Sequence, residues 1–396
     1  MKNENLVPKV RFKGFSDPWE QRKLGELFNE RKEKSSQGEL LSVTINSGIV
    51  KFDTLDRKNN SSADKSNYRV VRYGDIAYNS MRMWQGASGL SMYNGIVSPA
   101  YTVITPRTNT DAGFMAVNFK RKSMIQVFQR NSQGLTSDTW NLKFPVLKNI
   151  RISIPKITEQ QIITELFTVI NNLIAANEDK LEQLKTLKKL MMQKIFSQEW
   201  RFKGFTDPWE QRKLFEVTER VTRKNTQLQS TLPLTISAQY GLIDQNTFFD
   251  KQVASRDVSG YYLIKNGEFA YNKSYSKGYP VGTIKRLDKY SEGVLSTLYI
   301  LFKVTNADSQ FLVTYFEGNK WYQEVMKRAT EGARNHGLLN ISPKDFFNMH
   351  LFIPVKSEQY KVGSIILKIS CLIAANEDKL NQLKKLKKYL MQNMFV

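Results

Sequence analysis

The sequence contains the same long helical pattern twice, 199 residues apart. Residues 174–196 are IAANEDKLEQLKTLKKLMMQKIF and residues 373–395 are IAANEDKLNQLKKLKKYLMQNMF, so only six of the 23 paired positions differ. When each copy is extended towards the N-terminus, mostly apolar residues recur at alternating spacings of four and three. This spacing is typical of a coiled coil. We therefore predict that the two helices, the first covering residues 158–195, pair with each other. The predicted seam positions are Ile163, Phe167, Ile170, Ile174, Asn177, Leu181, Leu184, Lys188, Met191 and Ile195 in the first helix, and Val362, Ile366, Ile369, Ile373, Asn376, Leu380, Leu383, Lys387, Leu390 and Met394 in the second.

Both seams carry polar residues at the same two places, Asn177 with Asn376 and Lys188 with Lys387. A polar residue on a coiled-coil seam lowers stability, but it disfavours pairing in a wrong register. Two unrelated surface helices of similar composition would not share these exceptions. We therefore predict that these four residues set the register of the coiled coil.

A second repeat precedes each half of the chain. Residues 11–24 are RFKGFSDPWEQRKL and residues 201–214 are RFKGFTDPWEQRKL, and only Ser16 and Thr206 differ. The Gly-Phe and Asp-Pro pairs favour a turn, after which WEQRKL can enter a helix. Phe12, Phe15 and Trp19 are predicted to anchor this turn on a core; a docking surface for a partner is the alternative.

Two segments of similar length but different sequence lie between the repeats, at residues 25–155 and 215–354. Each shows an apolar strand (40–50; 232–243), a hairpin (70–76; 263–269) and a further strand pair (95–101; 293–299). An amphipathic helix (113–130; 308–330) and a last strand follow, and a Glu-Gln pair opens the long helix. The predicted fold class is therefore α+β, with two mixed α/β domains and two long helices. The expected domains are residues 1–155 and 200–354, and the expected helical segments are residues 156–199 and 355–396.

The order of the repeats predicts that the two helices run antiparallel. The first helix continues through a short link, residues 197–200, into the second RFKGF turn, and the chain ends where a second link would begin. Antiparallel pairing would return the end of the second helix to the first domain. The chain is therefore expected to be a cyclic repeat with pseudo-two-fold symmetry and neighbouring termini, built on helices about 57 Å long at ~1.5 Å per residue.

Composition favours a polyanionic partner. Lys and Arg number 59 against 37 Asp and Glu, which gives a net charge of +22, and such a surplus makes nucleic acid the first partner to consider. A single cysteine, Cys371, excludes internal disulfides and favours a reducing compartment. Since neither a long apolar run nor a signal core is present, we expect a cytoplasmic protein that does not span a membrane.

No set of residues predicts catalysis. The chain has two histidines, His336 and His350, and no zinc-ligand spacing can be assembled. It also lacks a phosphate-binding GxxxxGK[ST] loop and a GxGxxG motif after a strand. We therefore expect neither an enzyme nor a metal site.

Basic, polar and aromatic side chains gather instead on two loops of each domain. The first loop follows the shared Ala-Tyr-Asn (residues 79–86 and 272–279), and the second precedes the last strand (residues 130–141 and 328–336). Arg can read guanine, and Asn or Gln can read adenine, in the major groove; ordinary solvated loops are the alternative. The candidate DNA-binding residues are Asn79, Ser80, Arg82, Trp84, Gln85, Arg130, Gln133, Ser137, Thr139 and Asn141 in the first domain, and Asn272, Lys273, Ser274, Tyr275, Lys277, Arg328, Arg334, Asn335 and His336 in the second.

With these features together, the chain resembles the specificity subunits of type I restriction–modification systems over essentially its whole length. The segments GF-S/T-DPWEQRKL and IAANEDKL-x-QLK carry the resemblance. It implies a non-catalytic subunit that reads a bipartite target in double-stranded DNA, one half per variable domain. Two DNA-methyltransferase subunits would dock on its helices and two restriction/translocase subunits would join them; S-adenosylmethionine, ATP and magnesium would be bound by those partners and not by this chain.

Two other classes remain open on the residues alone. One is a basic architectural or regulatory DNA protein that uses a coiled coil as a ruler. The other is a coiled-coil scaffold for proteins, in which the charge is incidental. A two-part sequence preference for duplex DNA would distinguish the first interpretation from both.

Overall fold

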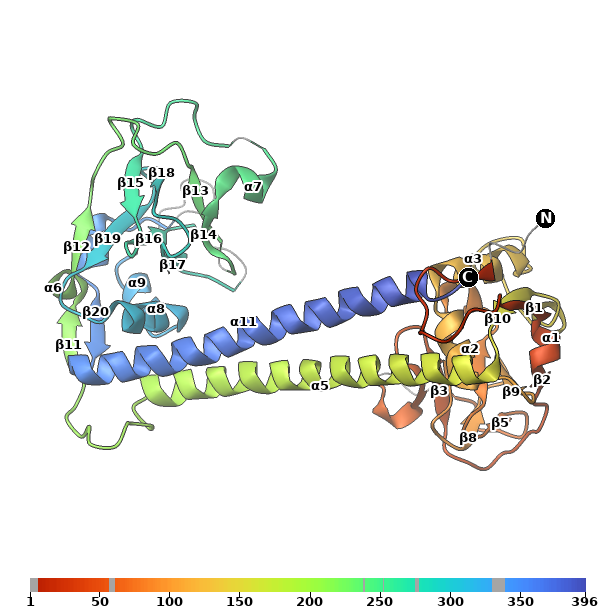
Figure 1. Cartoon of the computed structure of the whole chain (residues 1–396). Helices are drawn as coiled ribbons and strands as arrows, with labels where there is room; N and C mark the ends of the chain where they lie inside the picture. Colours follow the sequence, from red (N-terminus) through yellow and green to blue (C-terminus); the bar gives the residue numbers. More distant parts are fainter. Residues whose placement is uncertain (1–5, 57–60, 238, 252, 275–277, 330–338) are drawn as a thin grey trace. The chain divides into compact units, whose positions relative to one another are not determined.

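The computed structural model describes residues 6–56, 61–237, 239–251, 253–274, 278–329 and 339–396 (Figure 1). The chain forms two compact units. Unit 1 comprises Met1–Asp179 and Asp378–Val396, and unit 2 comprises Lys180–Glu377. Each unit contains one α+β domain, part of helix α5 (Ile157–Phe196) and part of helix α11 (Lys356–Asn393).

The sheets of unit 1 are all antiparallel. A four-stranded sheet has the order β2-β9-β6-β7, and three two-stranded sheets surround it. The four-stranded sheet contains β2 (Phe28–Glu30), β9 (Tyr101–Pro106), β6 (Ile76–Asn79) and β7 (Ser88–Leu90); the pairs are β1 (Glu20–Lys23) with β10 (Arg151–Ile154), β3 (Leu41–Thr44) with β4 (Gly48–Lys51), and β5 (Arg69–Val71) with β8 (Gly95–Val97). The helical elements are α1 (Leu24–Leu27), α2 (Ala112–Phe119), α3 (Lys122–Asn131) and α4 (Phe144–Leu147), with 3-10 turns η2 (Phe52–Thr54) and η3 (Met83–Gln85).

Strand β6 separates two apolar cores of unit 1, because successive side chains of a strand point to opposite faces. Ile76 and Tyr78 belong to the larger core, which also contains residues of α2, α3 and both long helices. Ala77 belongs to a smaller core with residues of β3, β5, β8 and β9. The central sheet is therefore buried on both faces.

Unit 2 repeats this topology. Its four-stranded sheet has the order β12-β19-β16-β17. The strands are β12 (Thr218–Val221), β19 (Ile300–Val304), β16 (Phe269–Asn272) and β17 (Thr283–Arg286); the pairs are β11 (Glu210–Lys213) with β20 (His350–Ile353), β13 (Leu234–Ser237) with β14 (Gly241–Asp244), and β15 (Tyr262–Lys265) with β18 (Glu292–Leu295). The helices are α6 (Leu214–Val217), α7 (Gln245–Phe249), α8 (Ser309–Glu317), α9 (Tyr322–Met326) and α10 (Pro343–Phe347).

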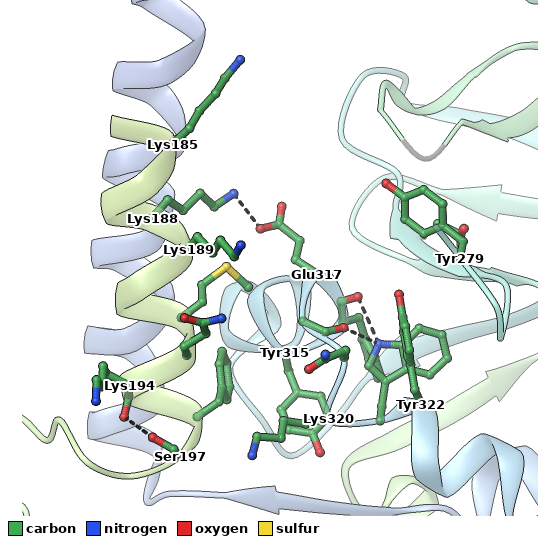
Figure 2. A pocket seen from close by; sticks show the side chains of 18 of the residues that line it. Lys185, Lys188, Lys189, Lys194, Ser197, Tyr279, Tyr315, Glu317, Lys320 and Tyr322 are labelled. Carbon is green, nitrogen blue, oxygen red and sulfur yellow. Dashed lines mark hydrogen bonds and ion pairs between the residues drawn. The ribbon is translucent and has the colours of Figure 1, made fainter. Parts of the chain in front are cut away.

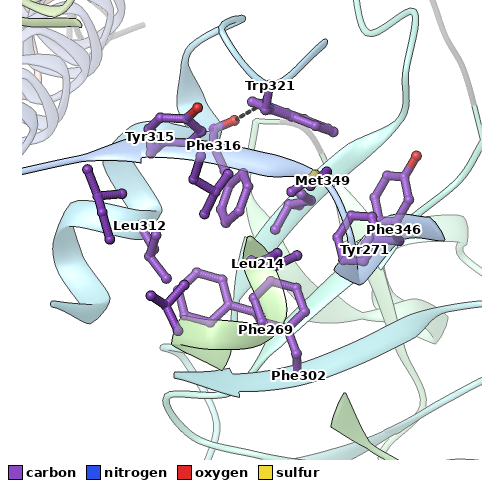
Figure 3. Close-up of a cluster of buried hydrophobic side chains, with 14 of the residues drawn as sticks. Leu214, Phe269, Tyr271, Phe302, Leu312, Tyr315, Phe316, Trp321, Phe346 and Met349 are labelled. Atoms are coloured by element: carbon purple, nitrogen blue, oxygen red, sulfur yellow. Dashed lines mark hydrogen bonds between the residues drawn. The ribbon is translucent and has the colours of Figure 1, made fainter. Parts of the chain in front are cut away.

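Aromatic rings fill the larger core of unit 2 (Figure 3). Phe269 stacks on Phe302 with ring centroids 5.1 Å apart, and Tyr271 stacks on Phe346 at 4.6 Å. The Tyr271 hydroxyl donates a hydrogen bond to the Val281 carbonyl, so burial leaves this polar group satisfied.

The strand pairing differs from the prediction in three places. The segment expected as one strand near residues 40–50 is the hairpin β3–β4, which turns at Gly48 with φ +66°. Conversely, residues 70–76 form no hairpin, since β5 pairs with β8 whereas β6 lies between β9 and β7. Residues 95–101 likewise belong to strands of two different sheets. In unit 2 the corresponding segments behave in the same way.

Occupied edges explain this result: β7 and β9 already bond both edges of β6, so β5 has no edge to join. The turn between β5 and β6 is fixed by Asp75, whose carboxylate accepts the backbone N–H of Arg72 and both Nε and Nη2 of Arg31. Glu268 holds the corresponding turn of unit 2 together with Arg223.

Two helix predictions were also wrong in detail. The single amphipathic helix expected at residues 113–130 is two helices, α2 and α3, which are separated at Lys120 and Arg121. Its counterpart in unit 2 is likewise divided into α8 and α9. The WEQRKL segments form the edge strands β1 and β11 before a short helix, because each pairs with the last strand of its own domain.

The predicted seam residues of the two long helices are at least partly shielded from solvent. All twenty seam positions are buried or half-buried, and Asn177 and Asn376 are each 7% exposed. In unit 1 Glu178 forms an ion pair with Lys384, and in unit 2 Lys185 forms one with Glu377, so the helices run antiparallel within each unit.

The end of one long helix enters the core of each domain. In unit 1 the Phe395 ring lies 5.3 Å from Phe114 and 6.0 Å from Trp19, and the backbone N–H of Val10 donates to the Asn393 carbonyl at 2.9 Å. The chain's C-terminus therefore lies against the first domain, as predicted (Figure 1). In unit 2 Phe196 contacts Trp209 and Phe311 in the same manner.

A candidate nucleic-acid interface

Both domains are fastened to their long helix by the same buried contacts. Arg11 donates from Nε and Nη2 to the Glu159 carboxylate at 2.8 Å, and Arg201 makes the corresponding pair with Glu358. The neighbouring Gln160 accepts the backbone N–H of Asp111 and donates to the Pro155 carbonyl. The repeated RFKGF turn and the Glu-Gln pair are thus two halves of one joint. Buried Trp19, with partly buried Phe12, confirms that the turn is anchored on the core.

The first predicted loop of unit 1 begins where β6 ends. The Asn79 Oδ1 accepts the backbone N–H of Met81 at 3.0 Å, which closes a tight turn. Gly86 ends η3 with φ +83°, and a Cβ there would lie 3.0 Å from Ile125 Cδ1, so the position favours glycine. This backbone leaves Gln85 exposed and Arg82 partly exposed.

The second predicted loop of unit 1 is joined to the first. Two backbone hydrogen bonds between Gln133 and Asn141 close it, at 2.9 and 2.8 Å, and the Leu142 N–H donates to the Ser80 carbonyl. The Trp84 and Trp140 rings meet edge to face at 5.3 Å. The two clusters therefore form one surface, on which Arg130, Gln133, Ser137 and Thr139 are exposed and Asn79 and Asn141 are partly exposed.

Ser80 differs from the other candidates of unit 1. Its side chain is buried, and its Oγ shares a 2.8 Å hydrogen bond with Thr102 Oγ1. Ser80 thus stabilises the base of the first loop.

In unit 2 the first predicted loop begins in the same way and is contacted by Leu339, which follows the second predicted loop. Asn272 Oδ1 accepts the Ser274 N–H at 3.0 Å, and the Leu339 N–H donates to the Lys273 carbonyl at 3.1 Å. Five of the predicted readers lie outside the described residues: Tyr275, Lys277, Arg334, Asn335 and His336.

Arg328 is engaged within its own domain. Its guanidinium donates to the Glu324 carboxylate at 2.7 Å and to the Asn348 carbonyl at 3.1 Å. Although burial acts to raise the pKa of Glu324, hydrogen bonds from the His350 N–H, Lys327 and Arg328 bring this pKa to about 2. Glu324 is therefore ionised at neutral pH and holds Arg328 in place.

Lysines of the long helices line two cavities that were not predicted from the sequence; of these lysines only Lys188 and Lys387 had been singled out, as seam residues. In unit 2 a cavity of about 890 Å³ lies between α5 and the domain (Figure 2). In unit 1 a cavity of about 550 Å³ lies beside α11. The repeated spacing LKxLKK could have indicated these sites, since it places three lysines on adjoining positions of one helix face. They are Lys185, Lys188 and Lys189 in unit 2 and Lys384, Lys387 and Lys388 in unit 1.

Metal-ligand clusters and membrane-spanning helices are two further features to consider in the described part of the chain. Among the described residues, no group of three His, Cys, Asp or Glu side chains could hold a metal ion. Within the same part of the chain, no helix is long and apolar enough to cross a membrane.

Comparison with known proteins agrees with this architecture. Residues 16–186 match the family model of the type I restriction modification DNA specificity domain. The chain is 22% identical over 347 residues to the type I restriction enzyme MjaVIII specificity subunit of Methanocaldococcus jannaschii, covering 81% of this chain and 78% of that protein. The crystal structure of the type I restriction–modification S subunit from M. genitalium superposes with a TM-score of 0.62 at 14% identity and covers 98% of this chain and 99% of that one.

Each unit combines a mixed α/β domain with segments of two antiparallel helices, and this architecture agrees with the matched family of DNA specificity domains. Residues 16–186 thus carry the type I restriction modification DNA specificity domain, and the chain as a whole is similar to specificity subunits of type I restriction–modification systems.

Proposed function

We propose that this chain reads a bipartite target in double-stranded DNA, one half-site per domain, across a gap that it does not read. The observation that carries the proposal is the joining of the two predicted loop clusters of unit 1 through Trp84 and Trp140. The frame is nearly identical in the two units while these loops differ in sequence. Such a design suits two related modules that recognise different bases.

The helices are proposed to dock two DNA-methyltransferase subunits. Large apolar side chains are exposed at matching positions of the two helices, and exposed apolar groups of this kind mark protein interfaces. Each unit carries one set, which would suit one copy of the same partner. The sets are Leu173, Leu386 and Tyr389 in unit 1 and Leu372, Leu187 and Leu190 in unit 2, between 39% and 55% exposed.

Catalysis is assigned to those partners in this proposal. The methylating subunits would bind S-adenosylmethionine, and two restriction/translocase subunits would use ATP and magnesium. This chain would supply sequence recognition and the frame for assembly.

Mapping methylated adenines tests the proposal. The chain is produced with its methylating subunit in a host, and the modified sites are compared before and after residues 25–155 are exchanged for another such domain. We expect one half of the target to change and the other half to remain. If both halves change, or neither does, the domains are not independent readers.

Docking has its own test. Replacing Leu187 and Leu190 by Glu should weaken binding of one methylating subunit, and the matched pair Leu386→Glu and Tyr389→Glu should weaken the other. A complex that keeps both subunits in both variants would contradict the assignment of these faces.

A further inference from the structure

The two domains place opposite charges at one equivalent position. Asp111 and Asp308 cap α2 and α8, each accepting a backbone N–H at 2.7 Å. Nine residues after the cap, unit 1 has Lys120 and unit 2 has Glu317. Both residues lie beside a lysine of the repeated helix, Lys387 in unit 1 and Lys188 in unit 2.

In unit 2 the charges neutralise each other. Lys188 Nζ lies 2.7 Å from Glu317 Oε2, within the cavity beside α5 (Figure 2). Lys285 lines the same cavity; its pKa is lowered by burial and by Lys188, while Glu317 acts to raise it. Glu317 thus supplies the carboxylate that faces Lys188, whereas Glu199, which also lines this cavity, pairs with Lys194.

In unit 1 the same place holds cations. Burial and, to a smaller extent, the charge of Lys387 lower the pKa of Lys120 to about 8. Lys120 Nζ donates to the carbonyls of Ile45 and Gly86 at 2.7 Å, which accounts for two of its three protons. Among the described residues, no carboxylate lies within ion-pair distance of Lys120 or Lys387.

A guanidinium adds to this site. Arg121, which replaces Gly318 of unit 2, donates from Nη1 to Asn118 Oδ1 and to the backbone oxygen of Val396, the last residue of the sequence. Its Nε is buried and has no hydrogen-bond partner within the described part of the chain. Since a buried unsatisfied N–H is unfavourable, an acceptor that reached this Nε would stabilise the arrangement. Six of the ten residues that line the cavity are cationic, and none is acidic: Lys120, Arg121, Lys122, Lys384, Lys387 and Lys388.

We propose that unit 1 binds a phosphate group in the cavity between Lys120 and Lys387, where unit 2 carries the Glu317 carboxylate. A phosphate group can accept hydrogen bonds from an ammonium and a guanidinium group at the same time. The two cations cannot bond each other, because both are donors only. Lys384 is already paired with Glu178, so the phosphate faces Lys120, Arg121 and Lys387.

The backbone of bound DNA is one source of this phosphate. This assignment rests on the proposed function. Lys120 bonds the carbonyl of Gly86, the last residue of the loop that carries Arg82 and Gln85. A phosphate in the cavity would therefore lie behind the proposed base-reading surface and fix the register of unit 1 on the duplex. A free phosphate ion is the other source with the same chemistry.

The DNA arm of the test measures the salt dependence of affinity for target duplex, with the full chain in its complex with the methylating subunits. Lys120→Glu recreates the charge pattern of unit 2 and should make the slope of log K against log salt shallower by about 0.9. Between 50 and 200 mM salt the advantage of the native protein over this variant should shrink by about 3.5-fold. Lys387→Gln should have the same effect, and Glu317→Lys should steepen the slope.

The matched control is the double variant Lys188→Gln with Glu317→Gln, which removes the pair from unit 2 without changing the net charge. Its slope should equal that of the native chain. Equal slopes for Lys120→Glu, Lys387→Gln and this control would count against a DNA phosphate in the cavity.

The second arm uses the full chain without DNA and replaces chloride by inorganic phosphate at constant ionic strength. A rise in melting temperature that Lys120→Glu abolishes, and the control variant retains, supports the site with free phosphate as its source. If neither arm responds to Lys120→Glu, the proposal is overturned, and it is also overturned if this variant weakens only the binding of methylating subunits. A native complex that shows no target preference refutes the proposed function, while the phosphate arm still tests this site.

Discussion

The joint between Arg11 and Glu159 provides a quantitative test of how the domain is held on its helix. The side chains are 11% and 2% exposed, and both hydrogen bonds measure 2.8 Å. Replacing Arg11 by Met would leave the Glu159 charge buried without its partner. Breaking a buried pair in this way costs about 3–5 kcal/mol. For a unit of this size, that loss corresponds to a melting temperature lower by roughly 6–20 °C.

The double variant Arg11→Met with Glu159→Met distinguishes the contribution of the ion pair from the contribution of the buried position itself. Because two buried charges lose hydration on folding, their joint replacement by apolar side chains should be neutral or stabilising by about 1–4 kcal/mol. The coupling free energy between the two substitutions should therefore reach several kcal/mol. Arg201→Met, with its counterpart at Glu358, gives a matched cycle in unit 2, where the side chains are 18% and 1% exposed.

Urea unfolding followed by circular dichroism supplies the free energies, and hydrogen exchange resolved by peptide assigns the loss to a unit. Arg11→Met should speed exchange in the first turns of α5, and Arg201→Met should do so in the first turns of α11. A loss below about 1 kcal/mol for Arg11→Met would refute the reasoning. So would a double variant that is less stable than either single variant.

Three further predictions concern the seam, a titrating lysine and a loop glycine. Replacing Asn177 and Asn376 by Leu should hold or raise thermal stability while permitting misregistered or oligomeric species, which light scattering detects; a large loss without new species would show that the amides do not act on register. The pKa of Lys120 is lowered to about 8, so between about pH 8 and 10.5 the unfolded chain binds more protons than the folded chain. The free energy of unfolding should therefore rise with pH in this window, and it should rise more in the native chain than in Lys120→Met. Parallel curves for the two proteins would contradict that origin. Gly86→Ala should destabilise unit 1 by about 1–2 kcal/mol in urea unfolding, since φ is +83° there, and an unchanged midpoint would contradict the strain.

The long helices followed directly from the sequence. An amphipathic helix is defined by residues three and four positions apart, so the pattern that forms it is local. Because this pattern is local, the two repeats could be compared residue by residue. Asn177 and Asn376 occupy equivalent positions in them and are equally buried. The α+β class was likewise predictable from the order of the elements, whereas the joint between Arg11 and Glu159 was not predicted.

Strand partners were not predictable in the same way. Turn residues near Gly74 are compatible with a hairpin, but the choice of partner depends on which sheet edges are free, and β7 and β9 already bond both edges of β6. Such pairing joins residues far apart in the sequence, and local turn chemistry does not specify it. The break between α2 and α3 at Lys120 is likewise not specified by the local sequence.

The charges around the repeated helix show most clearly what the sequence determines and what only the tertiary structure decides. Lys188 and Lys387 occupy equivalent places in nearly identical helices, and from the sequence they received the same interpretation. Tertiary structure sets Glu317 beside one and Lys120 beside the other, so the first lysine is neutralised by its domain and the second is not. Helical periodicity determined where each lysine stands on its helix, whereas only the packing of a divergent domain against that helix decided which charge it meets.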